Sequence, residues 1–206
     1  MAQLIRIHAQ NPELRLIRQA AQALLAGNVV IYPTDSTYAL ACHIGDKGAL
    51  ERIRQIRQLD DRHNFTLMCA DLSAIATYAK VNNSAYRLLK TYTPGPYTFI
   101  LTATAEVPRR LMHPKKKTIG LRIPDNVVAQ ALLQELGEPV MSTSLILPGE
   151  DTPLSEIHDI EERMGKRVDM IVDSGACGLE PTTVVDLVSG VPVLLREGKG
   201  NPDPFR

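Results

Sequence analysis

The stretch VVIYPTDSTY, residues Val29–Tyr38, joins a short apolar run to a cluster of polar side chains. Val29–Tyr32 is rich in β-branched residues and stops at Pro33, which is typical of a buried strand. The residues after Pro33 bring several hydroxyl groups and the Asp35 carboxylate to the end of that strand. Ligands of open α/β sheets bind at such strand ends. The same residues also suit a turn whose hydroxyls cap backbone groups, and the pattern favours neither interpretation.

Apolar and alternating runs predict further strands along the whole chain. The predicted strands are Leu4–Ile7, Val29–Tyr32, Phe65–Ala70, Tyr97–Thr104, Thr118–Ile123, Pro139–Ile146, Asp169–Val172, Thr183–Leu187 and Val191–Arg196. Apolar residues at helical spacing predict helices between them. The predicted helices run from Pro12 to Gly27 with Asn11 as cap, after Asp46, after Asp71, over Ser84–Tyr92, over Val127–Leu136 and after Ser155.

The order of these elements predicts the fold class. Several strands are joined by helical crossovers, whereas Ser189-Gly190 predicts a hairpin with a two-residue turn between the last two strands. The sheet should therefore be mixed, with roughly ten strands and helices packed on it. We expect an α/β fold in which residues 1–206 form a single domain with a twisted mixed sheet.

Composition limits the function classes. The 206 residues carry 23 basic and 23 acidic side chains, so a strongly basic nucleic-acid footprint is absent overall and must be local. Cys42, Cys69 and Cys177 are odd in number and far apart, which predicts neither a disulfide framework nor a zinc site. Nothing in residues 1–10 is typical of a signal peptide, and no apolar run has the length of a membrane span. We expect a soluble, cytoplasmic protein with no membrane partner and no metal site.

Standard nucleotide-binding and hydrolase motifs are missing, namely GxxxxGK[ST], GxGxxG, HExxH and Gly-x-Ser-x-Gly. Polar residues instead recur where predicted strands begin or end. They are found in Pro94-Gly95-Pro96-Tyr97-Thr98, Gly120–Pro124, Ser142-Thr143-Ser144, Pro181–Asp186 and Leu195–Gly198. Arg122 stands out because an arginine within a strand either faces outward or needs an anionic partner.

Taken in order, these segments resemble the YrdC family of threonylcarbamoyl-adenylate synthases, from about Leu14 to Gly198, and within it the bacterial YciO branch. The resemblance implies a YrdC-like fold, a concave mixed sheet with a basic cavity. It implies a reaction in which L-threonine, bicarbonate and ATP, supplied with Mg²⁺ as substrate, form threonylcarbamoyl-AMP and pyrophosphate. That product serves the modification of adenosine 37 in tRNA. No tightly bound cofactor is implied, and duplex RNA or tRNA is a further implied partner.

The resemblance also assigns roles to residues. It implies catalytic roles for Arg57 and Ser144. Residues implied to bind substrate or nucleotide are Thr34, Thr37, Tyr38, Arg62, Thr98, Arg122, Ser142, Thr143, Thr182 and Arg196. Candidate RNA-binding residues are Arg109, Arg110, Lys115, Lys116 and Lys117, a basic stretch followed by Arg122. This stretch also suits a solvated loop with no ligand.

The chain departs from the family at its catalytic tetrad, K-x-R and S-x-N. The first motif aligns with Arg57-Gln58-Leu59, and the second with Ser144-Leu145-Ile146. Arg57 stands in place of the lysine, Leu59 removes a guanidinium that can bind phosphate with two hydrogen bonds, and Ile146 removes an amide, so that only Ser144 is unchanged. Arg62 is close enough in sequence to compensate for the lost arginine. The chain is therefore a candidate synthase with an altered tetrad, a nucleic-acid-binding module without the reaction, or a stable domain with a vestigial pocket.

Overall fold

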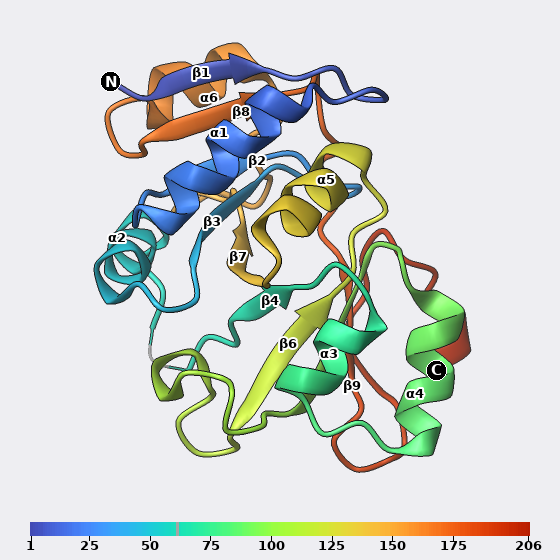
Figure 1. Cartoon of the computed structure of the whole chain (residues 1–206). Helices are drawn as coiled ribbons and strands as arrows, with labels where there is room; N and C mark the ends of the chain where they lie inside the picture. The colour runs from blue at the N-terminus through green and yellow to red at the C-terminus, as the bar shows by residue number, and fades with distance from the viewer. Residues whose placement is uncertain (61) are drawn as a thin grey trace.

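The computed structural model describes residues 1–60 and 62–206 (Figure 1). In this part of the chain, no helix is both long and apolar enough to cross a membrane. Ten strands form one sheet. They are β1 (Gln3–Arg6), β2 (Val30–Tyr32), β3 (Ala39–His43), β4 (Thr66–Met68), β5 (Tyr97–Thr102), β6 (Thr118–Arg122), β7 (Val140–Ser144), β8 (Met170–Asp173), β9 (Thr183–Asp186) and β10 (Val193–Arg196).

Six α-helices pack on this sheet in the described residues, together with two short 3₁₀ turns. The helices are α1 (Leu14–Leu25), α2 (Lys47–Arg57), α3 (Leu72–Tyr78), α4 (Asn83–Tyr92), α5 (Val127–Leu136) and α6 (Ile157–Met164). Helices α2 and α3 follow Asp46 and Asp71 as predicted, and these two side chains cap them by accepting hydrogen bonds from Ala49 N and Ala74 N.

The sheet is mixed, with strand order β1-β8-β2-β3-β7-β4-β6-β5-β9-β10. The pairs β1–β8, β2–β8, β4–β6 and β5–β9 are parallel. The pairs β2–β3, β3–β7, β4–β7, β5–β6 and β9–β10 are antiparallel. The predicted fold class is therefore confirmed, a mixed α/β sheet with helices on it.

Two apolar cores lie on opposite faces of the sheet because successive strand residues point to opposite sides. On β2, Ile31 belongs to one core, whereas Val30 and Tyr32 belong to the other. The first core holds the apolar residues of α2, α3, α4 and α6. The second core holds those of α1 and α5, which lie side by side across the upper part of the sheet in Figure 1. The part of this sheet face that α1 and α5 do not cover contains a cavity.

Three predictions about elements were wrong. Strand β3 was not predicted, because the sequence ALACH lacks the β-branched and aromatic residues typical of strands. Asn11 does not cap α1, since its backbone N–H donates to His8 Nδ1 in a turn and the helix begins only at Leu14. The hairpin between β9 and β10 forms, but its connection spans residues 187–192 instead of two residues. Its turn is centred one residue before Ser189-Gly190, because the Gly190 N–H donates to the Leu187 carbonyl and the Val188 N–H to Asp186 Oδ1.

Candidate functional site

A cavity of about 300 Å³ opens on the sheet face that α1 and α5 leave uncovered. That size lies at the lower end for small-molecule sites. Its walls come from seven neighbouring strands, β3, β7, β4, β6, β5, β9 and β10, together with the C-terminal end of α2 and the loops after α2 and β7. The lining residues are Ala39, Arg57, His63, Asn64, Thr66, Met68, Thr98, Ile100, Arg122, Ser142, Thr143, Ser144, Ile146, Thr182, Val184, Leu195 and Arg196.

The strand pairing explains why hydroxyls collect here. Thr66 of β4 pairs with Gly120 of β6 on one side and with Ser142 of β7 on the other. A Cβ at Gly120 would lie 2.9 Å from Thr66 Oγ1 and 3.2 Å from Thr98 Cγ2, so only glycine leaves room for these side chains. The Ser142 hydroxyl is held by Tyr32 Oη at 2.7 Å, and burial raises the pKa of Tyr32 to about 12.

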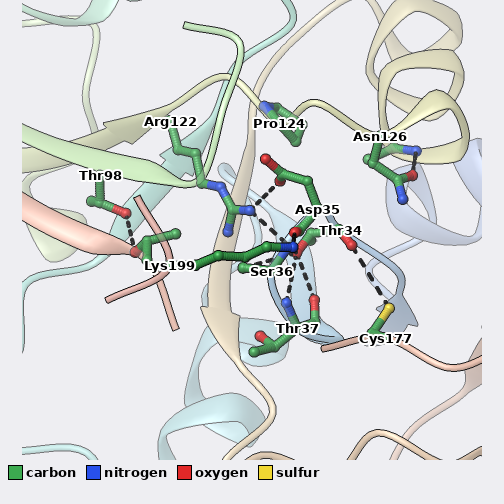
Figure 2. A network of polar contacts seen from close by, with 12 residues as sticks. Thr34, Asp35, Ser36, Thr37, Thr98, Arg122, Pro124, Asn126, Cys177 and Lys199 are labelled. Atoms are coloured by element: carbon green, nitrogen blue, oxygen red, sulfur yellow. Dashed lines mark hydrogen bonds and ion pairs between the residues drawn. The ribbon is translucent and has the colours of Figure 1, made fainter. Parts of the chain in front are cut away.

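Arg122 is a buried cation with a carboxylate partner. Its guanidinium NH2 group donates to Asp35 Oδ1 in a close ion pair and to Thr34 Oγ1 at 3.3 Å (Figure 2). Leu121 and Ile123 point into the opposite core, as alternation along the strand requires. The interpretation of Arg122 as an inward-facing arginine with an anionic partner is therefore confirmed, and that partner is Asp35.

Arg57 ends α2 and reaches the loop after β7. Its NH1 group donates to the backbone carbonyls of Ser144 at 2.8 Å and Ile146 at 2.6 Å. Its Nε is buried, and no hydrogen-bond partner for it is found in the described residues. Burial, followed by the charge of Arg196, lowers the pKa of Arg57.

Arg196 ends β10 on the other side of the cavity. Its Nε and NH2 groups donate to the Thr182 carbonyl at 3.1 and 2.8 Å, and NH2 also reaches Thr182 Oγ1 at 3.2 Å. That hydroxyl in turn contacts Thr98 Oγ1 at 2.8 Å. Desolvation and then the charge of Arg122 lower the pKa of Arg196.

These three arginines give the cavity an unbalanced positive charge. No Asp or Glu is among its described lining residues. Only Arg122 has a carboxylate partner, and neither Arg57 nor Arg196 forms an ion pair within residues 1–60 and 62–206. Burial, and then the charge of a neighbouring arginine, lowers the pKa of both Arg57 and Arg196. Such a site favours an anionic ligand that supplies the missing negative charge.

Some residues of the predicted site lie away from the cavity. Thr34 Oγ1 accepts the backbone N–H groups of Ser36 and Thr37 and donates to the Thr37 carbonyl at 2.6 Å, as in the capped-turn interpretation (Figure 2). The Thr37 hydroxyl donates to the Tyr38 carbonyl, and Tyr38 is buried with its own hydroxyl on the Gly175 carbonyl. Arg62 is exposed outside the cavity lining, so it does not replace the missing arginine in this structure.

Other residues at the site had no signal in the sequence. Asp35 was noted only as a carboxylate beside hydroxyls, and its pairing with Arg122 spans 87 positions. Lys199 is exposed near the C-terminus, yet its Nζ donates to the Asp35 backbone carbonyl (Figure 2). His63 belongs to none of the spaced metal-ligand patterns and still lines the cavity. In the described residues, no group of three or more His, Cys, Asp and Glu side chains could hold a metal ion.

Comparison with known proteins identifies the family. The model for Sua5, YciO and YrdC proteins, described as telomere recombination, matches residues 22–198. The chain belongs to this family. One relative, YciO from Escherichia coli, is 56% identical to this chain over 205 residues, and the match covers all of both chains. The E. coli YciO crystal structure matches all of both chains with a TM-score of 0.97.

Relatives with a named activity are more distant. A threonylcarbamoyl-AMP synthase from Vibrio vulnificus is 30% identical over 159 residues, which are 76% of this chain and 84% of that protein. The crystal structure of P. abyssi Sua5 complexed with L-threonine has a TM-score of 0.86 at 28% identity. That match covers 95% of this chain and 57% of the Sua5 chain. The predicted family is therefore confirmed.

Of the three positions expected to be altered in the family tetrad, Arg57 keeps a cation, whereas Leu59 and Ile146 are apolar and lie in different surroundings. The Ile146 side chain lines the cavity and adds apolar surface close to Arg57. Leu59 is half-buried and packs against the core instead of lining the cavity. Ile146 is therefore part of the cavity wall, whereas Leu59 is not.

The basic stretch divides into two parts. Arg109 and Lys115–Lys117 are exposed on the connection between β5 and β6. Arg110 is half-buried, and its NH2 group donates to the Ile44 carbonyl at 3.0 Å. Arg122 faces the cavity and does not extend this surface, which corrects the prediction of one continuous stretch.

Proposed function

We propose that the cavity binds the phosphates of ATP and that the protein is a slow, altered member of the threonylcarbamoyl-AMP synthase group. The convergence of Arg57, Arg122 and Arg196 on one cavity in a chain of zero net charge supports nucleotide binding most strongly. The 30% identity to a threonylcarbamoyl-AMP synthase supports the reaction class. The relative that is complexed with L-threonine supports threonine as the amino-acid substrate.

The chemistry is the attack of a carbamate oxygen on the α-phosphorus of ATP, with pyrophosphate as the leaving group. Negative charge spreads over the phosphoryl oxygens in the transition state, and preorganised cations stabilise it. Arg57 and Arg196 lie on opposite walls and are fixed by backbone carbonyls, so they pay little reorganisation on binding. Mg²⁺ enters with ATP as part of the substrate, since it keeps waters and phosphate oxygens as ligands.

Ile146 is the reason to expect slow chemistry. An isoleucine at the cavity wall offers no hydrogen bond where the family has an amide. Each lost preorganised donor costs about two to three orders of magnitude in rate in well-studied cases. Ground-state binding should survive better, because the remaining arginines and hydroxyls hold the substrate before reaction.

Titration calorimetry with ATP and Mg²⁺ tests nucleotide binding. Arg196→Ala should weaken affinity at least tenfold, because hydrogen bonds to charged groups contribute about 1.5–3 kcal/mol each. Arg206→Ala is the matched control, since Arg206 is exposed and pairs with Glu197 and Asp203 outside the cavity lining. Equal affinity of wild type and Arg196→Ala would contradict the assignment. Pyrophosphate release that needs both L-threonine and bicarbonate would support the synthase reaction, and its absence would leave a binding protein.

A second function is supported by the exposed lysines. Lys115–Lys117 lie together on one loop and carry positive charge in a neutral chain. We propose duplex RNA as their partner, because A-form duplexes are recognised mainly through shape and phosphates, and this chain has few aromatic residues for stacking bases. The affinity should fall steeply with salt and vary little between unrelated duplexes.

A further inference from the structure

The side chain of His63 lines the cavity close to its arginines. Its ring packs edge-on against Phe65 with the ring centroids 5.3 Å apart, and Phe65 is itself buried in the core. Packing therefore fixes the imidazole. In residues 1–60 and 62–206, neither ring nitrogen has a hydrogen-bond partner. Both nitrogens are left for a ligand in the cavity that the ring lines.

The charges around His63 are mostly positive. Arg54 and Arg57 approach from α2 and Arg196 from β10, while Asp60 in the following loop is the one acidic group that opposes them among the described residues. Burial and then Arg57 lower the pKa of His63 to about 4, against a smaller opposing effect of Asp60. At pH 7 the ligand-free protein therefore holds this imidazole neutral.

We propose that His63 takes up a proton from solvent when a phosphate-bearing ligand binds, and that the imidazolium formed then donates a hydrogen bond to that ligand. This inference rests on the proposed function, because it requires an anion in the cavity. Phosphate charge beside Arg57 and Arg196 cancels the field that keeps the ring neutral, and it attracts the proton directly. His63 thus supplies a cation that exists only with ligand bound, in a chain where Leu59 aligns with the arginine of the family tetrad.

The direction of the pH dependence follows from linkage. A group whose pKa rises on binding strengthens binding as the pH falls toward the bound-state value. If the bound ring returns to the ordinary histidine value of about 6.5, this group alone strengthens binding about tenfold between pH 7.5 and pH 5.5. ATP itself titrates in this range, so the comparison must be made against a variant that lacks only the imidazole.

The experiment follows the histidine ring signals by NMR between pH 8 and pH 5.5, with and without saturating ATP and Mg²⁺. The His63 signal is the one missing in His63→Gln, and His158→Gln on the exposed surface of α6 is the matched control. We expect no titration of His63 without ATP and a midpoint near 6.5 with ATP. Calorimetry at pH 6 in two buffers of different ionisation enthalpy should show about 0.7 proton more taken up by wild type than by His63→Gln.

Three outcomes would overturn the inference, and they are distinguishable. If ATP binds but His63 does not titrate and proton uptake equals that of His63→Gln, the inference fails and the proposed function stands. If His63 titrates near 6.5 without any ligand, the surrounding cations do not hold it neutral, and the inference fails. If wild type does not bind ATP at all, the proposed function fails and the inference falls with it.

Discussion

Replacing Arg122 with methionine should destabilise the protein strongly. The side chains of Arg122 and Asp35 are only 6% and 10% exposed, so the variant leaves a buried carboxylate without its main partner. One oxygen of that carboxylate, Asp35 Oδ2, already has no partner in the described residues. Removing one member of a buried ion pair costs about 3–5 kcal/mol. We expect a loss near 3 kcal/mol, because Lys199 lies beside the Asp35 backbone and offsets part of the negative charge.

A matched control separates burial from charge loss. Arg6 also pairs with an aspartate, Asp173, but its side chain is 81% exposed and the N–O distance is 3.5 Å. Exposed pairs contribute about 0–1 kcal/mol, so Arg6→Met should change stability little. The double variant Arg122→Met with Asp35→Asn should recover part of the loss, since neither charge remains buried alone.

Urea unfolding of all four proteins measures the effect. Arg122→Met should also lower the melting temperature by about 6–12 °C, because 1 kcal/mol corresponds to about 2–4 °C for a chain of this length. The reasoning would be refuted if Arg122→Met lost no more stability than Arg6→Met. It would also be refuted if adding Asp35→Asn destabilised Arg122→Met further.

Three other predictions concern the tetrad, the lysine loop and the thiols. Ile146→Asn should speed pyrophosphate release from ATP with threonine and bicarbonate, because position 146 lines the cavity. Adding Leu59→Arg should raise the rate by a smaller factor, because position 59 packs on the core. An unchanged rate in a folded Ile146→Asn variant that binds ATP would contradict the altered-tetrad account. Changing Lys115–Lys117 to alanine should weaken duplex RNA binding and make the affinity less dependent on salt concentration, with a change in slope equivalent to the loss of up to about three phosphate contacts. An unchanged slope would rule this loop out as the RNA-binding site. Cys42 and Cys69 should not react with a thiol reagent at pH 8 in the native protein, because both are buried and burial raises the pKa of Cys42 to about 12; labelling at the rate seen in guanidinium would disagree with this.

The sequence predicted the fold class because strand and helix patterns are local. Val29–Tyr32 and Thr118–Ile123 are apolar enough to be identified as strands without knowledge of their partners. Strand β3 was not predicted because Ala39 and Ala41 have low strand propensity. Its pairing with β2 and β7 provides the stabilisation that its sequence does not show.

The site was predicted less completely, because its geometry depends on contacts between distant segments. Arg122 and Arg196 could be chosen from their strand-end positions, and both line the cavity. The Arg122–Asp35 pair, in contrast, depends on the register of strands 87 positions apart. His63 is placed by packing against Phe65, and neighbouring residues in sequence gave no hint of the cations around it.

The most direct test of the account is a crystal structure of the protein with a non-hydrolysable ATP analogue and Mg²⁺. The account predicts that the triphosphate lies in the cavity, with its oxygens within hydrogen-bond distance of the Arg57 and Arg196 guanidinium groups. Phosphates bound only at Lys115–Lys117, or a cavity whose arginines contact no ligand at saturating analogue, would contradict it.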